Sequence, residues 1–253
     1  QKFTGFSQTV AGMISEIERI SDPVEETTRA CSTVLAKVSD LDKQVHTSAE
    51  MLTAASSKID HLVSFSENVI GEVAQSGIET EDTPLIRHCI AKAQEVGAIF
   101  EQAVASGALS LSDLFDEAYQ PIPGTNPQQH MTRFTKHTDR LLPPIQEAML
   151  DFDPRVTFCA AIDRNGYLPT HNHIYSQPQS TDPVWNAGNC RNRRIFNDRT
   201  GLSAGRNQKP FLLQTYRRDM GGGNFSLMKD LSAPIIINGR HWGGLRIGFK
   251  INS

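Results

Sequence analysis

The feature that most constrains the fold is an apolar stripe that recurs every seven residues through the first part of the 253-residue chain. One set of positions at this interval runs from Phe3 to Val73, and a second set, three residues further on, runs from Phe6 to Val69. Nearly all of these positions are apolar, which is typical of a coiled coil and rare in a globular amphipathic helix. Because a strict seven-residue period keeps the stripe facing a partner only when helices supercoil, we expect residues 1–78 to form a rod. Its partner is expected to be a second copy of the chain or another helix, in a two-stranded coil or a four-helix bundle.

The rod carries one interruption and several weak core positions. The sequence Ser21-Asp22-Pro23 is suited to start a new helix, but the seven-residue register continues across it and favours a kink or a short break. Thr27, Ser48 and Ser66 occupy core positions, where polar side chains lower stability and leave helices easier to shift. This property suits a rod that transmits a signal. Ser76-Gly77 is expected to end the rod.

The second unit, residues 79–253, changes from a helical to a strand pattern. Helices are expected over residues 85–104, in a short turn capped by Ser110 and Ser112, and over residues 128–149, where Pro143-Pro144 must bend or split the helix. From Arg155 onward, short apolar runs predict strands at residues 156–162, 167–171, 211–216, 225–228, 234–237 and 242–249. Asn165-Gly166 and Asn238-Gly239 are predicted hairpin turns. The expected fold is therefore α+β, with long coiled-coil helices followed by an antiparallel β-sheet domain with flanking helices.

Three segments of the second unit carry a family resemblance: EQAVASGALSLSDLFDEAY, VTFCAAIDRNGYLPTHN and LSAPIIINGRHWGGLRIGF. Together they resemble a single Cache domain, the PAS-like sensor of bacterial receptors, over residues 83–251. A rod joined to such a domain is similar to a methyl-accepting chemotaxis receptor, although here the sensor follows the coiled coil and the Glu-rich hairpin tip of that family is missing. The resemblance implies a ligand-binding sensor in chemotaxis signal transduction, with chemotaxis signalling proteins as partners. It also implies a cytoplasmic location, as a fragment of a longer receptor whose membrane segment lies elsewhere.

Polar and aromatic side chains gather in two stretches of the second unit and near its third predicted strand. The arginine fork is suited to carboxylates, and aromatic side chains commonly wall small-molecule pockets. The candidate ligand-binding residues are His171, His173, Tyr175, Trp185, Cys190, Arg191, Arg193, Arg194, Tyr216 and Arg217. Two alternatives stay open: the arginines pair with Asp182, Asp198 and Asp219, or these polar side chains only satisfy loop backbone.

A haem or metal sensor is the alternative function. In a strand, His171 and His173 would lie on one face, and with Cys190 or His241 they could ligate a metal or haem iron. No third ligand has a diagnostic spacing. A third hypothesis, a structural oligomerisation module with a degenerate sensor, predicts no enclosed polar pocket.

Other classes of function lack sequence support. The chain contains no P-loop or HExxH motif, so we do not expect an enzyme. The formal net charge of −3 gives no general attraction to nucleic acid. No run of apolar residues is long enough to span a membrane. The four scattered cysteines are expected to be reduced and mostly buried.

Overall fold

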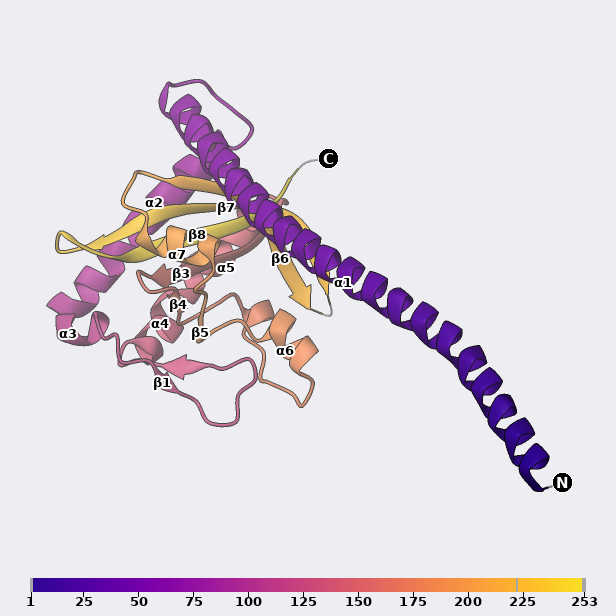
Figure 1. The fold of residues 1–253 in the computed structure, drawn as a ribbon. Coiled ribbons are helices and arrows are strands. Elements are labelled where there is room, and N and C mark those ends of the chain that lie inside the picture. Colours follow the sequence, from indigo (N-terminus) through magenta and orange to yellow (C-terminus); the bar gives the residue numbers. More distant parts are fainter. Residues whose placement is uncertain (1, 222, 252–253) are drawn as a thin grey trace. The chain divides into compact units, whose positions relative to one another are not determined.

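The computed structural model describes the backbone of residues 2–221 and 223–251, and their side chains except those of residues 2–8, 74–75, 217, 219–221 and 224. The α+β fold is confirmed: a long helix precedes antiparallel sheets that pack with helices (Figure 1). Two compact units, Gln1–Leu62 and Val63–Ser253, divide the chain. The second unit therefore includes the last turns of the long helix.

Helix α1 (Lys2–Gln75) is continuous and contains Pro23 in its interior, so the alternative of a new helix starting there is wrong. Near the proline, the Thr27 hydroxyl donates to the Pro23 carbonyl at 2.7 Å, within the same helix. Many apolar side chains of α1 are exposed in the single chain; Leu52, for example, is 72% exposed. Exposed apolar side chains at coiled-coil positions indicate oligomerisation through a coiled coil. Among the described residues, no helix is apolar over a length that would cross a membrane.

The helices of the second unit follow most of the sequence signals. They are α2 (Thr83–Ala105), α3 (Leu111–Leu114), α4 (Thr135–Leu141), α5 (Pro143–Phe152), η1 (His173–Tyr175), α6 (Pro183–Asn189) and α7 (Arg199–Arg206). Ser110 caps α3 as predicted, accepting from the Asp113 amide. The helix predicted over residues 128–149 is split before Pro143. The prediction is wrong for residues 128–134, which are not helical. Residues there form β2 (His130–Met131), which pairs with β1 (Gln120–Pro121), because long-range pairing outweighs local helical preference.

The main sheet has the strand order β3-β8-β7-β6 and is antiparallel throughout. Its strands are β3 (Val156–Asp163), β6 (Leu212–Gly221), β7 (Asn224–Ile237) and β8 (Arg240–Lys250). The turn at Asn238-Gly239 is confirmed, with positive φ angles of 48° and 75°. The two strands predicted over 225–228 and 234–237 are one strand, β7. The polar residues Asp230 and Ser232 interrupt its apolar pattern because they face the second side of the sheet.

The predicted hairpin at Asn165-Gly166 is wrong in its pairing. The turn exists, and the Asp163 carboxylate closes it by accepting from the amides of Asn165 and Tyr167, both at 2.9 Å. After the turn, however, β4 (Tyr167–Leu168) pairs with β5 (Arg194–Ile195) and not with β3. Phe196 donates its amide to the Gly166 carbonyl at 2.7 Å, so a remote segment takes the place of the expected neighbour.

The two faces of the sheet are chemically different, as alternation along antiparallel strands requires. Helices α2 and α5 pack on one face, over the core residues Leu231, Ala233, Ile235, Leu245 and Ile247. Helix α7 packs on the other face (Figure 1). Gly244 permits this close approach, because a Cβ there would lie 2.5 Å from the Ala204 carbonyl oxygen in α7.

Candidate functional site

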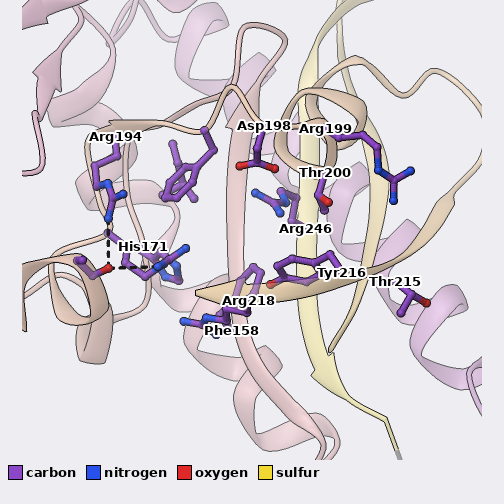
Figure 2. A pocket seen from close by; sticks show the side chains of 14 residues that line it. Phe158, His171, Arg194, Asp198, Arg199, Thr200, Thr215, Tyr216, Arg218 and Arg246 are labelled. Atoms are coloured by element: carbon purple, nitrogen blue, oxygen red, sulfur yellow. Dashed lines mark hydrogen bonds between the residues drawn. The ribbon is translucent and has the colours of Figure 1, made fainter. Parts of the chain in front are cut away.

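A cavity of about 550 Å³ lies on the α7 side of the sheet, within the second unit. Its floor is formed by strand residues, including Phe158, Tyr216 and Arg218, and its walls by the segment from α6 to α7 (Figure 2). This volume lies within the usual range for small-molecule pockets. The lining combines aromatic rings with a group of guanidinium side chains.

Five arginines line the cavity: Arg191, Arg194, Arg199, Arg218 and Arg246. Described carboxylates bind Arg246 and Arg199. The Arg246 guanidinium contacts Asp230 with an Nη2–Oδ2 distance of 2.8 Å, and both side chains are buried. The Arg199 guanidinium contacts Glu67 with an Nη2–Oε1 distance of 3.0 Å. Arg191 and Arg194 each donate to the Ala187 carbonyl at 3.2 Å.

Arg218 is a buried cation without a carboxylate partner among the described side chains. The residue is 2% exposed, and its guanidinium lies over the rings of Tyr175 and Phe158, 4.6 and 5.0 Å from their centroids. Its Nη1 donates to the Thr157 hydroxyl at 3.4 Å, and its Nε has no hydrogen-bond partner. It forms no ion pair with any carboxylate that the structure describes. Because a buried charge without a partner is costly, Arg218 points to a missing anion.

Arg191 extends the positive region of the cavity. Burial, followed by the neighbouring charges of Arg218 and Arg194, lowers its pKa to about 9. The guanidinium groups of Arg191 and Arg194 both lie 5.1 Å from the centroid of the Phe196 ring. Within the described part of the chain, no carboxylate forms an ion pair with Arg191. An anion between these groups would relieve their mutual repulsion.

His171 supplies a neutral donor. It is buried, and its Nδ1 accepts from the Asn172 amide at 2.8 Å, which leaves the proton of the neutral ring on Nε2. Burial, followed by the charges of Arg191, Arg218 and Arg246, holds its pKa well below the ordinary value. The imidazole is therefore neutral at physiological pH.

Tyr216 and Asp198 complete the polar lining. Burial raises the pKa of Tyr216 to about 12, so its phenol stays protonated. Asp198 is the N-cap of α7 and accepts from the Gly201 amide at 3.0 Å. The cavity thus offers hydroxyl and imidazole donors together with guanidinium groups, which is an arrangement suited to anion binding.

The predicted site residues are only partly brought together. His171, Arg191, Arg194 and Tyr216 line the cavity, and the Tyr175 ring lies against the Arg218 guanidinium. The others lie elsewhere: His173 and Trp185 are exposed, Cys190 is buried with its Sγ 3.5 Å from the Pro178 carbonyl, and Arg193 binds Asp139 at 2.9 Å. The side chain of Arg217 lies outside the described residues.

Sequence reasoning missed Phe158, Phe196 and Arg246, as well as the carboxylate Asp230 beneath the cavity. It recognised Arg217-Arg218 as a pair of arginines suited to a carboxylate but selected Arg217, whereas the structure places Arg218 at the cavity. A usable signal existed for the charged residues. Asp230 and Arg246 each interrupt an apolar strand at an alternate position, and both are buried. The two phenylalanines carried no signal of this kind.

The expected placement of His171 and His173 on one strand face is wrong. Neither residue lies in a strand, because η1 begins at His173 and the preceding residues are irregular. His241 lies at the start of β8. In the described part of the chain, no three side chains of His, Cys, Asp or Glu gather as a metal site would require. The haem or metal hypothesis therefore gains no support and stays a prediction.

All four cysteines are free, and Cys89, Cys159 and Cys190 are buried whereas Cys31 is exposed. Burial raises the pKa of the Cys89 thiol, which α2 places in the core. These thiols are thus packing residues and not part of the cavity.

A search for relatives leaves the site without a family assignment: no family model matches the chain, and no curated protein matches it in sequence.

Proposed function

We propose that this chain is a signalling protein of the bacterial chemotaxis-receptor type, whose second unit senses a small anionic ligand and whose long helix reports binding through a homodimeric coiled coil. The observation that carries the proposal is the buried guanidinium of Arg218, which faces the cavity without a carboxylate partner in the described chain. The resemblance to a Cache-type sensor attached to a rod supports the same function. A degenerate sensor would not be expected to keep such a polar cavity.

The charge of the lining suggests the class of ligand. Arg191 and Arg218 lack ion pairs with described carboxylates, so two positive charges are available to one ligand. Their planar forks are suited to bidentate contact with carboxylates. We therefore propose a small dianion, such as a dicarboxylate, with the neutral donors of His171 and Tyr216 fixing its orientation.

The test uses the full chain and a series of linear dicarboxylates from malonate to adipate, followed by thermal unfolding and calorimetry. At a concentration 100 times Kd, a ligand that binds only the folded state stabilises it by about 2.7 kcal/mol. For a domain of this size, that free energy corresponds to a rise in Tm of about 5–10 °C. The monoamide of each acid carries one negative charge less and is expected to bind at least tenfold more weakly.

Arg218→Met is the critical variant, and Arg240→Met is its matched control, because Arg240 is exposed and lies over Phe115. Methionine removes the charge of Arg218 and keeps much of its apolar volume, so the unliganded domain should be at least as stable as the wild type. We expect the dicarboxylate-induced rise in Tm to vanish in Arg218→Met and to persist in Arg240→Met. An equal rise in both variants would remove Arg218 from the site.

The proposed partners follow from the same function: a second copy of the chain along α1, a small-molecule ligand, and chemotaxis signalling proteins in the cytoplasm. For the haem or metal alternative, the visible absorption spectrum and elemental analysis of the purified protein are the direct measurements.

A further inference from the structure

The first turn of α7 lies within the second unit and both lines the cavity and contacts the end of α1. Its N-cap, Asp198, and its second residue, Thr200, line the cavity. Arg199, between them, donates to Glu67 of α1 through two hydrogen bonds, with Nη2–Oε1 and Nη1–Oε2 distances of 3.0 and 3.2 Å. In Figure 2, the Asp198 carboxylate points toward Arg246, whereas the Arg199 side chain extends away from both.

The ion pair between Arg199 and Glu67 is suited to transmit a movement of α7 to the end of α1. A bidentate contact between a guanidinium and a carboxylate fixes orientation as well as distance. The Glu67 side chain is 10% exposed and the Arg199 side chain 41%, so water and salt screen the pair less than a fully exposed ion pair and more than a buried one. Movement of Arg199 would therefore carry Glu67, and the end of α1, with it.

The remainder of α7 is held against the sheet. Gly205 leaves room for the Asp163 carbonyl, which a side chain at this position would overlap, and Ala204 lies against Gly244 of β8. The N-terminal turn faces the cavity and is held by other contacts: Gly201 packs against the Phe196 carbonyl, and Gln214 Nε2 donates to the Thr200 carbonyl at 3.1 Å. A force applied there would shift the first turn against these contacts, while the second turn stays anchored to the sheet.

Asp198 is where a bound anion would apply such a force. It is the one carboxylate among the described lining residues, and the other charged lining groups are arginines. An anion near these arginines attracts them and repels Asp198. Because the Asp198 side chain also caps α7, displacement of its carboxylate alters the position or the capping of the first turn.

We propose that Arg199 couples anion binding to α1, by transmitting a displacement of the first turn of α7 to Glu67. This inference rests on the proposed function, since it concerns the regulation exerted by the same cavity. A ligand shifts such an equilibrium only if it binds the two arrangements with different affinity, and Asp198 supplies that difference. Because coupling between two sites is reciprocal, the position of α1 and the affinity for the anion change each other by the same factor, commonly 5–150-fold. Breaking the Arg199–Glu67 pair should therefore change the affinity for the anion by no more than this factor.

Hydrogen exchange of the backbone amides of residues 63–75, measured with and without saturating succinate, reports the output, while calorimetry on the same samples reports binding. In the wild type, succinate is expected to change exchange in this segment at least threefold. Glu67→Gln, which removes the carboxylate of the pair and lies outside the cavity lining, should retain succinate binding and lose the exchange response. The charge exchange Arg199→Glu with Glu67→Arg should restore part of it.

Asp198→Asn removes the repulsion between the anion and residue 198 and leaves the Arg199–Glu67 ion pair in place, because asparagine is an equally good N-cap but carries no charge. It should bind succinate more tightly and show a smaller exchange response. Arg133→Gln, which removes an ion pair with Asp113 outside the cavity, is the control and should respond like the wild type.

The outcomes distinguish the coupling to α1 from the anion site itself. If succinate binds but Glu67→Gln keeps the wild-type exchange response, or if the wild type shows none, the coupling is overturned and the anion site stands. If no dicarboxylate of the series binds to the wild type, the proposed function fails and the coupling fails with it.

Discussion

Replacing Asp230 with leucine is expected to lower the free energy of unfolding of the second unit by about 3–5 kcal/mol, the range found when one partner of a buried ion pair is removed. The contact with Arg246 consists of an Nη2–Oδ2 distance of 2.8 Å and Nε distances of 3.1 and 3.3 Å to the two carboxylate oxygens. Both residues are buried, at 0% and 5% exposure. Two well-formed hydrogen bonds to a charged group, at about 1.5–3 kcal/mol each, give a similar total.

The environment of the pair places the expected loss toward the upper part of this range. Once Asp230 is removed, the Arg246 guanidinium stays buried on a face of the sheet that also carries Arg218 and Arg191. The converse variant, Arg246→Met, should cost less. Burial already raises the pKa of Asp230, so a carboxyl left alone can take up a proton and become neutral.

Urea unfolding of the full chain, followed by tryptophan emission, measures these differences. Trp242 is buried and donates its Nε1–H to the Leu114 carbonyl at 2.8 Å, so its emission reports the core of the second unit. Trp185 is partly exposed already and should change less. The double variant Asp230→Leu with Arg246→Met replaces the pair by apolar side chains and should lie close to the wild type.

The control is Glu95→Gln, which removes an ion pair with Lys92 on the helix surface and should change the unfolding free energy by less than about 1 kcal/mol. The reasoning would be refuted by an Asp230→Leu variant within about 1 kcal/mol of the wild type, or by a double variant that shows the sum of both single losses.

Four further predictions concern other parts of the chain. Burial raises the pKa of Asp163 to about 6, against about 3.9 in an unfolded chain, so the folded state holds this proton more tightly and stability should rise as pH falls from 6 to 4, by at most about 3 kcal/mol. Urea unfolding across this range should show that contribution in the wild type and not in Asp163→Asn; identical pH profiles would contradict it. Gly244→Val should cost about 1–3 kcal/mol in the same assay, because its side chain meets the Ala204 carbonyl, and unchanged stability would argue against the close packing of α7. A thiol reagent should reach Cys89, Cys159 and Cys190 only after unfolding, with mass spectrometry counting the adducts; early labelling of Cys89 would show that its site opens. Leu41→Asp places a charge in the apolar stripe and should weaken self-association in analytical ultracentrifugation, whereas Lys37→Asp, outside the stripe, should not; equal effects would count against a coiled coil.

Features that depend on a few neighbouring residues could be predicted from the sequence. The seven-residue period determined that α1 is long and carries an apolar stripe, and it correctly outweighed the signal of Pro23 for a new helix. The Asn238-Gly239 turn and the Ser110 cap were also readable, since each depends on backbone conformation or hydrogen bonds within four residues. In the same way, Pro143 marked the point where a predicted helix had to divide.

What tertiary structure alone decided is which remote segments meet. The Asn165-Gly166 turn was visible, yet the strand after it pairs with β5, because a segment almost thirty residues later supplies the hydrogen bonds. The cavity has the same origin: strand residues such as Arg218 and Arg246 meet Arg191 from the loop after α6. A single strand does not reveal whether its buried charge will find a carboxylate, as Arg246 finds Asp230, or lack one among the described side chains, as Arg218 does. Local sequence sets backbone conformation, but the energy of a buried charge depends on groups that only the folded chain brings within a few ångströms.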